Sequence, residues 1–189
     1  MKKFTILFAL LFSLSVCSSL HAQHLKQFGN KGVWELGGVI GWSNITPVIN
    51  GGTETATGIF QLQPIAGYFV AKSIEIAIEP SITLTSYNGN STTNMTLYFA
   101  PGYNFIFKGS KVYPAIHALI GYSSFSGTGL TSRSGLSLGL AAGVKINLLG
   151  NSLLDMGLQF QSVTLNPSGA SSRNGQNIIT IGAGWSVFF

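Results

Sequence analysis

Six ionisable side chains lie within runs of alternating apolar residues, where all six share the polar phase. They are Glu35, Glu75, Glu79, His117, Lys145 and Asp155. Such groups facing one interior can form a hydrogen-bonded plug, line a path for cations or, with Ser81, supply a nucleophile, a base and an orienting carboxylate. Because four acids face one lysine, a proton, a cation or water must balance the excess negative charge.

The plug is the favoured interpretation, and a gated cation path is the alternative. His117 is the only histidine within the alternating runs, and no His-x-Ser arrangement follows it. The acids lie mostly at another level from His117, so we expect no catalytic site and no metal site. Cys17 is the only cysteine and lies in the first segment, which removes thiol chemistry from the rest of the chain. We expect no cofactor.

These residues lie on eight segments in which apolar side chains recur at every second position, as in β-strands. One alternate set is apolar, and the other carries every charge and every amide of the segments. Glycines on the polar phase leave room for long polar side chains and for water. The segments are 33–43, 58–70, 74–86, 95–107, 112–123, 135–148, 153–163 and 178–189.

The apolar set must face either a protein core or lipid. Only 8% of the 189 residues are charged, against about 25% in a soluble domain, so a soluble sandwich would lack its usual charged surface. No stretch beyond the first segment approaches the roughly 20 apolar residues of a spanning helix. The pattern therefore predicts an all-β fold, an eight-stranded antiparallel up-and-down transmembrane β-barrel over 33–189. We expect it to be a monomer in contact with outer-membrane lipid.

Aromatic residues and connection lengths agree with a barrel that spans a membrane. The connections 71–73, 108–111 and 149–152 are short and expected to be periplasmic, whereas 44–57, 87–94, 124–134 and 164–177 are longer and could bind an extracellular ligand. Two aromatic girdles are expected at the two interfaces. One contains Trp34, Tyr68, Tyr103 and Trp185, and the other contains Trp42, Phe60 and Tyr122.

Four prolines interrupt the expected strands on the lipid-facing phase, where each removes a hydrogen bond of the ladder. They are Pro64, Pro80, Pro101 and Pro114. Local bulges and bends are the favoured interpretation. The alternative is a weak seam that opens sideways to a hydrophobic ligand.

The first 22 residues have the pattern of a secretory signal peptide. Lys2 and Lys3 precede an apolar run, and Ala22 offers a small residue at the cleavage site. Residues 23–32 are then expected to form a periplasmic tail. The remaining basic residues are scattered, so we expect no nucleic-acid partner.

The chain resembles small outer-membrane β-barrels of the OmpA N-terminal, OmpX and opacity-protein superfamily, in its Bacteroidetes-type version. The resemblance lies in the eight amphipathic segments and in the alternating C-terminal residues Trp185, Val187 and Phe189. It implies a bacterial outer-membrane location and a C-terminal signal that the barrel-insertion machinery reads. Similar barrels differ in function. We expect a structural or surface-interaction role, with a narrow channel or small-ligand carrier as the alternative.

Overall fold

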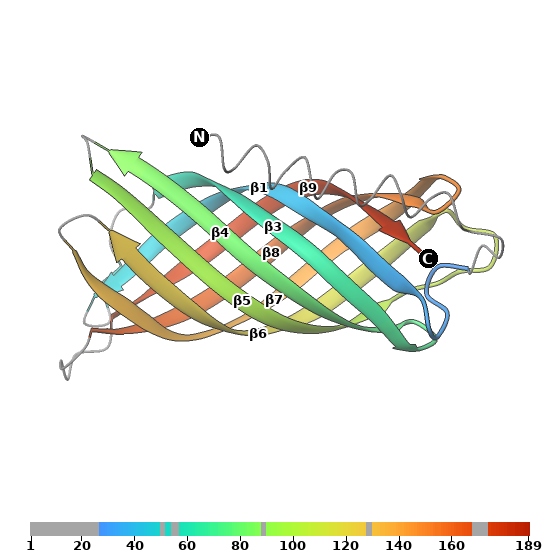
Figure 1. The fold of residues 1–189 in the computed structure, drawn as a ribbon, viewed down its shortest axis with the longest axis horizontal. Helices are drawn as coiled ribbons and strands as arrows, with labels where there is room; N and C mark the ends of the chain where they lie inside the picture. Colours follow the sequence, from blue (N-terminus) through green and yellow to red (C-terminus); the bar gives the residue numbers. More distant parts are fainter. Residues whose placement is uncertain (1–26, 50–51, 54–56, 88–89, 128–129, 168–173) are drawn as a thin grey trace.

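The computed structural model describes residues 27–49, 52–53, 57–87, 90–127, 130–167 and 174–189, and their regular secondary structure is entirely β (Figure 1). The expected signal peptide lies outside the described residues. Within the described residues, no helix combines the length and the hydropathy needed to span a membrane. The strands are β1 (Trp34–Ile49), β2 (Gly52–Thr53), β3 (Thr57–Ala71), β4 (Ile74–Tyr87), β5 (Asn90–Asn104), β6 (Val112–Gly127), β7 (Leu130–Leu149), β8 (Ser152–Pro167) and β9 (Asn174–Phe188).

The eight long strands close into one antiparallel barrel. From β1 to β9 each long strand pairs with the next one along the chain, and β9 pairs back with β1 from Glu35↔Phe188 to Ile49↔Asn174. The two-residue β2 only extends the end of β1. Closure pairs both sides of every long strand, which is what a lipid environment demands of backbone N–H and C=O groups. The predicted eight-stranded up-and-down barrel is confirmed.

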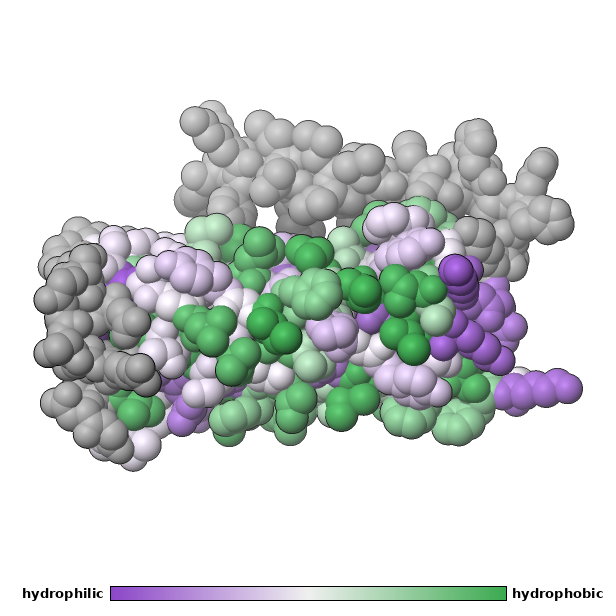
Figure 2. All heavy atoms as spheres, turned by 90° about the horizontal axis from the view of Figure 1, so that it is seen from below, coloured by the Kyte–Doolittle hydropathy of each residue, from purple (hydrophilic) through white to green (hydrophobic). Residues whose placement is uncertain are grey.

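Side chains alternate between an apolar exterior and a largely polar interior. On β6, Ile116 and Ile120 are exposed, whereas His117 and Leu119 between them are buried. The same alternation along the other strands covers the outside with Leu, Ile, Met and aromatic side chains, and Figure 2 shows this hydrophobic surface over the middle of the barrel. Apolar side chains with no protein to cover them are those of a lipid-facing surface.

At the end of the barrel away from Phe189, the strands are longer than the sequence pattern predicted. The expected loops 44–57, 87–94, 124–134 and 164–177 are strand in most of their described residues. Their remaining parts, 50–51, 54–56, 88–89, 128–129 and 168–173, lie outside the described residues. These segments are rich in Ser, Thr and Asn, a composition that is also typical of loops, so the sequence pattern predicted loops there. Inside this end of the barrel, Val163, Leu165 and Ile178 pack together.

At the other end, where the described chain begins at Gln27 and where Phe189 lies, the turns are tight. β3 and β4 are joined by two residues, as are β7 and β8, close to the expected turns 71–73 and 149–152. The β5–β6 connection is longer than predicted because β5 ends at Asn104 instead of continuing to 107. We call this end of the barrel the terminus end, and the other the opposite end.

Candidate functional site: the barrel interior

The structure places all six ionisable residues of the sequence analysis inside the barrel. Each is at most 8% exposed. They come from five strands, since Glu75 and Glu79 share β4 while Glu35, His117, Lys145 and Asp155 lie on β1, β6, β7 and β8. Side chains far apart in the sequence therefore meet only because the sheet closes.

Lys145 is the centre of the charged cluster. Its ammonium donates a hydrogen bond to Glu35 Oε1 and lies 4.0 Å from Glu75 Oε2. Asn104 Nδ2 donates to the same Glu75 oxygen at 2.9 Å. Lys145 and Asp155 are cross-strand partners. The ammonium nevertheless turns to Glu35, and neither carboxylate oxygen of Asp155 has a hydrogen-bond partner in the described part of the chain.

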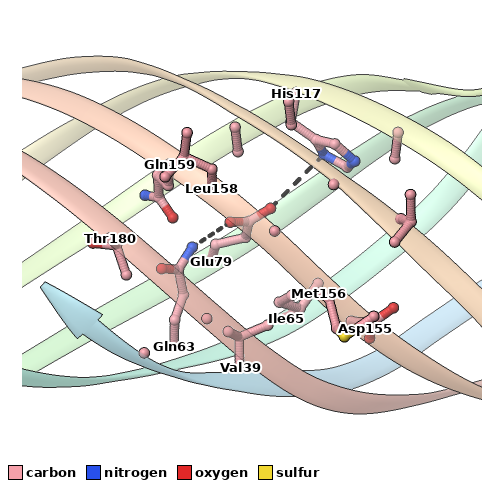
Figure 3. Close-up of a pocket in the computed structure, with 18 of the residues that line it drawn as sticks. Val39, Gln63, Ile65, Glu79, His117, Asp155, Met156, Leu158, Gln159 and Thr180 are labelled. Atoms are coloured by element: carbon pink, nitrogen blue, oxygen red, sulfur yellow. Dashed lines mark hydrogen bonds and ion pairs between the residues drawn. The ribbon is translucent and has the colours of Figure 1, made fainter.

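Glu79 links the cluster to a chain of amides. Its Oε2 accepts a hydrogen bond from Gln63 Nε2 at 2.5 Å, and its Oε1 lies 3.9 Å from His117 Nδ1 (Figure 3). His117 Nε2 is also 3.9 Å from Glu75 Oε2. Among the described residues, His117 Nδ1 has no hydrogen-bond partner. Nor do any three acidic, histidine or cysteine side chains of the described part gather as metal ligands.

Further polar side chains fill the interior toward the opposite end. Ser43 donates to Gln61 Oε1 at 2.6 Å, Gln61 Nε2 donates to Gln63 at 2.8 Å, and Thr180 donates to Gln61 at 3.2 Å. Tyr98 shares a hydrogen bond with Ser137 and donates to Gln161. Tyr98 is not among the interior residues predicted from the sequence. Its position between the lipid-facing Leu97 and Phe99 is the signal that would have placed it inside.

A cavity of about 110 Å³ lies within this network. Gln63, Glu79, His117 and Asp155 line it (Figure 3). On its other side four glycines pair in one row across neighbouring strands: Gly143, Gly157, Gly182 and Gly41. They leave the wall free of side chains, and at Gly143 a Cβ would lie 2.4 Å from the Met156 carbonyl oxygen. The volume is enough for several water molecules.

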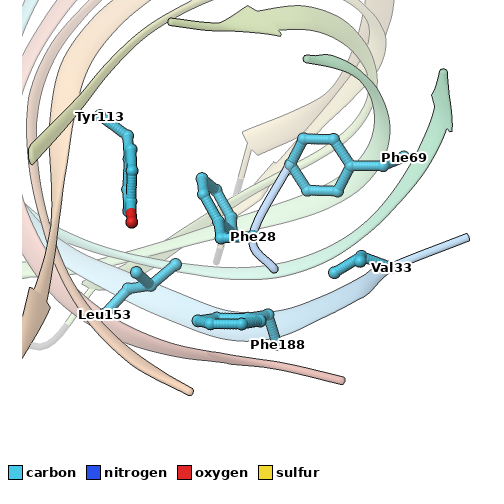
Figure 4. Close-up of a cluster of buried hydrophobic side chains, with 6 residues drawn as sticks. All are labelled: Phe28, Val33, Phe69, Tyr113, Leu153 and Phe188. Carbon is cyan, nitrogen blue, oxygen red and sulfur yellow. The ribbon is translucent and has the colours of Figure 1, made fainter. Parts of the chain in front are cut away.

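The terminus end of the interior is closed by an aromatic cluster (Figure 4). Residues 27–33 turn into the barrel mouth and bury Phe28, which is 1% exposed. The Phe28 ring lies 5.1 Å from Phe69, 5.0 Å from Tyr113 and 5.4 Å from Phe188, all between centroids. Val33 and Leu153 complete the cluster.

This segment is also bonded to the barrel and to the charged cluster. Ser73 N donates to the Gly29 carbonyl at 2.7 Å, and Gly32 N donates to the Phe69 carbonyl at 2.9 Å. The Lys145 ammonium lies 5.8 Å from the centre of the Phe28 ring, within the range of a cation–π contact. The sequence pattern predicted only a periplasmic tail over 23–32 for this segment. A large apolar residue beside Gly29 and Gly32 is the weak signal that they could fold into the mouth.

The aromatic residues expected in girdles lie on the exterior in two groups. Trp34 contacts Tyr68 with ring centroids 4.8 Å apart, and Trp42 contacts Phe60 at 5.2 Å. Tyr68 is half-buried and the others are exposed. The members that complete the two groups are also exposed: Tyr103 and Trp185 in the first, Tyr122 in the second.

The C-terminal residues close the barrel against its first strand. Trp34 N donates to the Phe189 carbonyl at 2.9 Å, and Phe189 N donates to the Trp34 carbonyl at 3.0 Å. Trp185, Val187 and Phe189 share the lipid-facing phase of this last strand, with Trp185 and Phe189 exposed and Val187 half-buried.

Comparison with known proteins gives structural likeness alone. No family model and no curated protein matches the chain. The structure of Neisserial surface protein A superimposes with a TM-score of 0.61 at 17% identity, over 83% of this chain and 99% of that one. The Pseudomonas aeruginosa outer membrane protein OprG gives 0.54 at 13% identity, over 85% and 97%. The N-terminal β-barrel domain of P. aeruginosa OprF gives 0.52 at 13%, over 80% and 97%.

The chain therefore has the fold of a small outer-membrane β-barrel. Its exterior is that of a barrel embedded in lipid, and its interior is a buried polar network closed at the terminus end. At these levels of identity the likeness concerns the fold, and the particular role has to be argued from the residues of this chain.

Proposed function

We propose that this chain is a monomeric integral outer-membrane protein that acts as a closed, rigid scaffold. Its opposite end would face the cell exterior and interact with the surroundings, and its termini would lie in the periplasm, as an even number of strands requires. The observation that carries the proposal is the hydrogen-bonded interior. Hydrogen bonds tie together side chains from all eight long strands, and Phe28 closes the mouth.

The alternative, a channel or small-ligand carrier, needs a continuous path. Within the described residues, the cavity lies between the aromatic cluster on one side and the amide chain on the other. Planar-bilayer recordings test this point directly. We expect no stable conductance steps from the wild type. Stable steps whose size changes in Lys145→Ala would favour the channel instead, because this ammonium would then line the path.

The opposite end offers uncharged hydrogen-bonding groups. Exposed residues of its strand ends include Asn44, Thr53, Ser124, Ser126, Ser132 and Thr164. Half-buried Arg133 is the only charged residue described there. Hydroxyl and amide groups on a rigid scaffold suit a partner that is itself uncharged and rich in hydroxyl groups. A neutral polysaccharide is the partner class that this surface fits.

Retention of expressing cells on immobilised dextran tests this role, with dextran sulfate as the charged comparison. The variant carries alanine at Ser124, Ser126, Ser132 and Thr164, and the control carries alanine at the exposed Gln27 and Asn30 of the terminus end. We expect the first variant to lose retention on dextran and the control to keep it. Equal retention of both variants, or retention on dextran sulfate alone, would contradict a neutral partner.

Assembly is proposed to use the C-terminal residues Trp185, Val187 and Phe189. Support comes from the position of β9, which pairs with β8 on one side and with β1 on the other. Recognition of this last strand by the insertion machinery would precede the closing β1–β9 ladder. Outer-membrane yield of Phe189→Ala, compared with Phe60→Ala elsewhere on the lipid face, separates a signal from general hydrophobicity.

A further inference from the structure

The lysines of the terminus end stand at the tips of its connections. Lys31 precedes Gly32, Lys72 precedes Ser73, and Lys108 precedes Gly109. The three following residues have φ values of 83°, 67° and 76°, in the left-handed region. The chain turns at each of these points. Lys111 follows in the same connection as Lys108, and all four lysines are exposed.

Backbone hydrogen bonds hold these connections to one another and to the barrel. The Ser73 carbonyl accepts from Asn104 N at 2.8 Å, while Ser73 N donates to the Gly29 carbonyl at 2.7 Å. Asn147 N donates to the Lys111 carbonyl at 2.7 Å. The lysines are therefore carried on a fixed frame. We call Lys31, Lys72, Lys108 and Lys111 the basic rim.

No described acidic side chain offsets the charge of the basic rim. Glu35, Glu75, Glu79 and Asp155 are all buried inside the barrel. Figure 2 shows strongly hydrophilic residues gathered at one end of the molecule, beyond the hydrophobic surface. An anion that comes within a Debye length of about 10 Å of these lysines is attracted by them, and no exposed carboxylate side chain among the described residues opposes the attraction.

The basic rim also borders the lipid-facing surface. Trp34, Tyr68 and Tyr103 lie on the strands next to these connections, and Tyr103 contacts Phe105 with centroids 4.9 Å apart. Aromatic side chains of this kind mark the level of lipid headgroups. Phe107, 57% exposed, lies directly before Lys108. A long lysine side chain beside such rings can lay its stem on apolar surface and put its ammonium at the phosphates.

We propose that the basic rim binds the phosphates of anionic glycerophospholipids in the leaflet that surrounds the terminus end. The position of the lysines favours lipid over a soluble anion. They lie at the edge of the lipid-facing surface, before β1 and in the β3–β4 and β5–β6 connections. The mouth itself is occupied by the uncharged Phe28 cluster. The β7–β8 turn fits the same arrangement. There an apolar residue, Leu149, takes the place of lysine before Gly150, whose φ is 57°.

Native mass spectrometry of the full chain in detergent with equal amounts of phosphatidylglycerol and phosphatidylcholine tests the proposal. The variant has all four lysines changed to Gln, and the control has all four changed to Arg, which keeps the charge. Each basic side chain near an anionic surface contributes about fivefold to binding, roughly 1 kcal/mol. We expect the wild type and the Arg control to select phosphatidylglycerol at least fivefold, and the Gln variant to show no selection.

Three results would overturn the proposal. One is equal selection by the Gln variant, and another is selection that persists in concentrated salt. The third is a rim-dependent preference for lipid A over phosphatidylglycerol, because lipid A belongs to the other leaflet. Folding of each variant is checked by the heat-dependent shift in electrophoretic mobility. We expect each variant to fold, because the four substituted side chains are exposed and lie outside the barrel interior. The proposal rests on membrane embedding but not on the polysaccharide or channel experiments.

Discussion

At the scale of single residues, the interior is governed by one buried cation. Lys145 is hydrogen-bonded to Glu35 and near Glu75, while Asp155 and Glu79 have no described cation within hydrogen-bond distance. A buried ion pair adds little net stability when formed, because both charges lose their hydration. Losing one partner is different, since the remaining charge stays buried and uncompensated.

Lys145→Met should therefore destabilise the barrel by about 3–5 kcal/mol. Unfolding by guanidinium in lipid vesicles, followed by tryptophan fluorescence, measures the change. The control is the double variant Lys145→Met with Glu35→Gln, which removes the stranded charge and should recover much of the loss. If the single and double variants were equally stable, the buried charge of Glu35 would not need Lys145 to compensate it.

At the scale of elements, the segment 27–33 is held in place by backbone geometry. Gly29 has a φ of 79°, and a Cβ there would lie 2.6 Å from Ile106 side-chain atoms. Gly150 in the β7–β8 turn has a φ of 57°, and an added Cβ there would have nothing within 4 Å. Both positions share the backbone constraint, and only Gly29 adds a clash.

Gly150→Ala should cost about 1–2 kcal/mol from the left-handed backbone alone. Gly29→Ala should cost more and should also loosen the Phe28 cluster. Denaturant midpoints give the stability difference, and near-ultraviolet circular dichroism reports the packing of Phe28 against Tyr113. Equal midpoints for the two variants would show that Ile106 gives way and that the segment is not tightly seated.

The four strand prolines have unequal effects on the ladder. Pro64 and Pro80 lie directly opposite each other on β3 and β4, and pairing is interrupted between Leu62↔Ile82 and Ala66↔Ile78. At Pro101 the β5–β6 pairing also breaks, between Phe99↔Ile120 and Gly102↔His117. Pro114, in contrast, stays paired with Val144. Side chains bridge the β3–β4 interruption on the inside, through the Gln63–Glu79 hydrogen bond.

Replacing Pro64 and Pro80 together by Ala should restore the missing N–H donors. A regained backbone hydrogen bond is worth about 0.5–1.5 kcal/mol, so the double variant should be more stable than the wild type. Amide hydrogen exchange should slow at the flanking residues 63, 65, 79 and 81, and the amides gained at positions 64 and 80 should be protected. Pro114→Ala is the control, because its ladder is already continuous. No slowing at these amides would mean that the interruption has another cause.

At the scale of the whole molecule, the barrel is a polar interior wrapped in an apolar exterior. Leu140 lies in the middle of the lipid-facing side of β7, and Leu149 lies at its end, 82% exposed. The same strand thus offers two exposed leucines that should differ mainly in membrane depth. A charge costs about 2–4 kcal/mol at the centre of a bilayer and about 0–1 near its interfaces.

Leu140→Arg should accordingly destabilise the vesicle-embedded barrel by about 2–4 kcal/mol, and Leu149→Arg by at most about 1. Reversible unfolding from vesicles measures both. A soluble sandwich with a water-facing exterior would tolerate the two substitutions equally. That result would contradict the lipid-facing assignment.

The sequence by itself determined the architecture and which face of each strand points outward. Alternation over eight segments depends only on the period of a strand, and the scarcity of charge excludes a water-facing exterior. Both are local properties, so they can be read along the chain without knowing which strands meet. The phase of Glu35, His117 and Lys145 follows from the same counting.

Tertiary structure decided which side chains meet across the interior and how the barrel ends. Glu35 reaches Lys145 over 110 residues of sequence because β1 and β7 face each other across the lumen. Phe28 enters the mouth because its ring fills a space lined by side chains from four strands, β3, β6, β8 and β9. The extension of the strands into polar segments is seen only in the pairing of neighbouring strands, such as Thr85↔Thr92 and Ser124↔Ser134, which strand period alone does not reveal. Such contacts arise only when the sheet closes, since closure brings distant positions to one level.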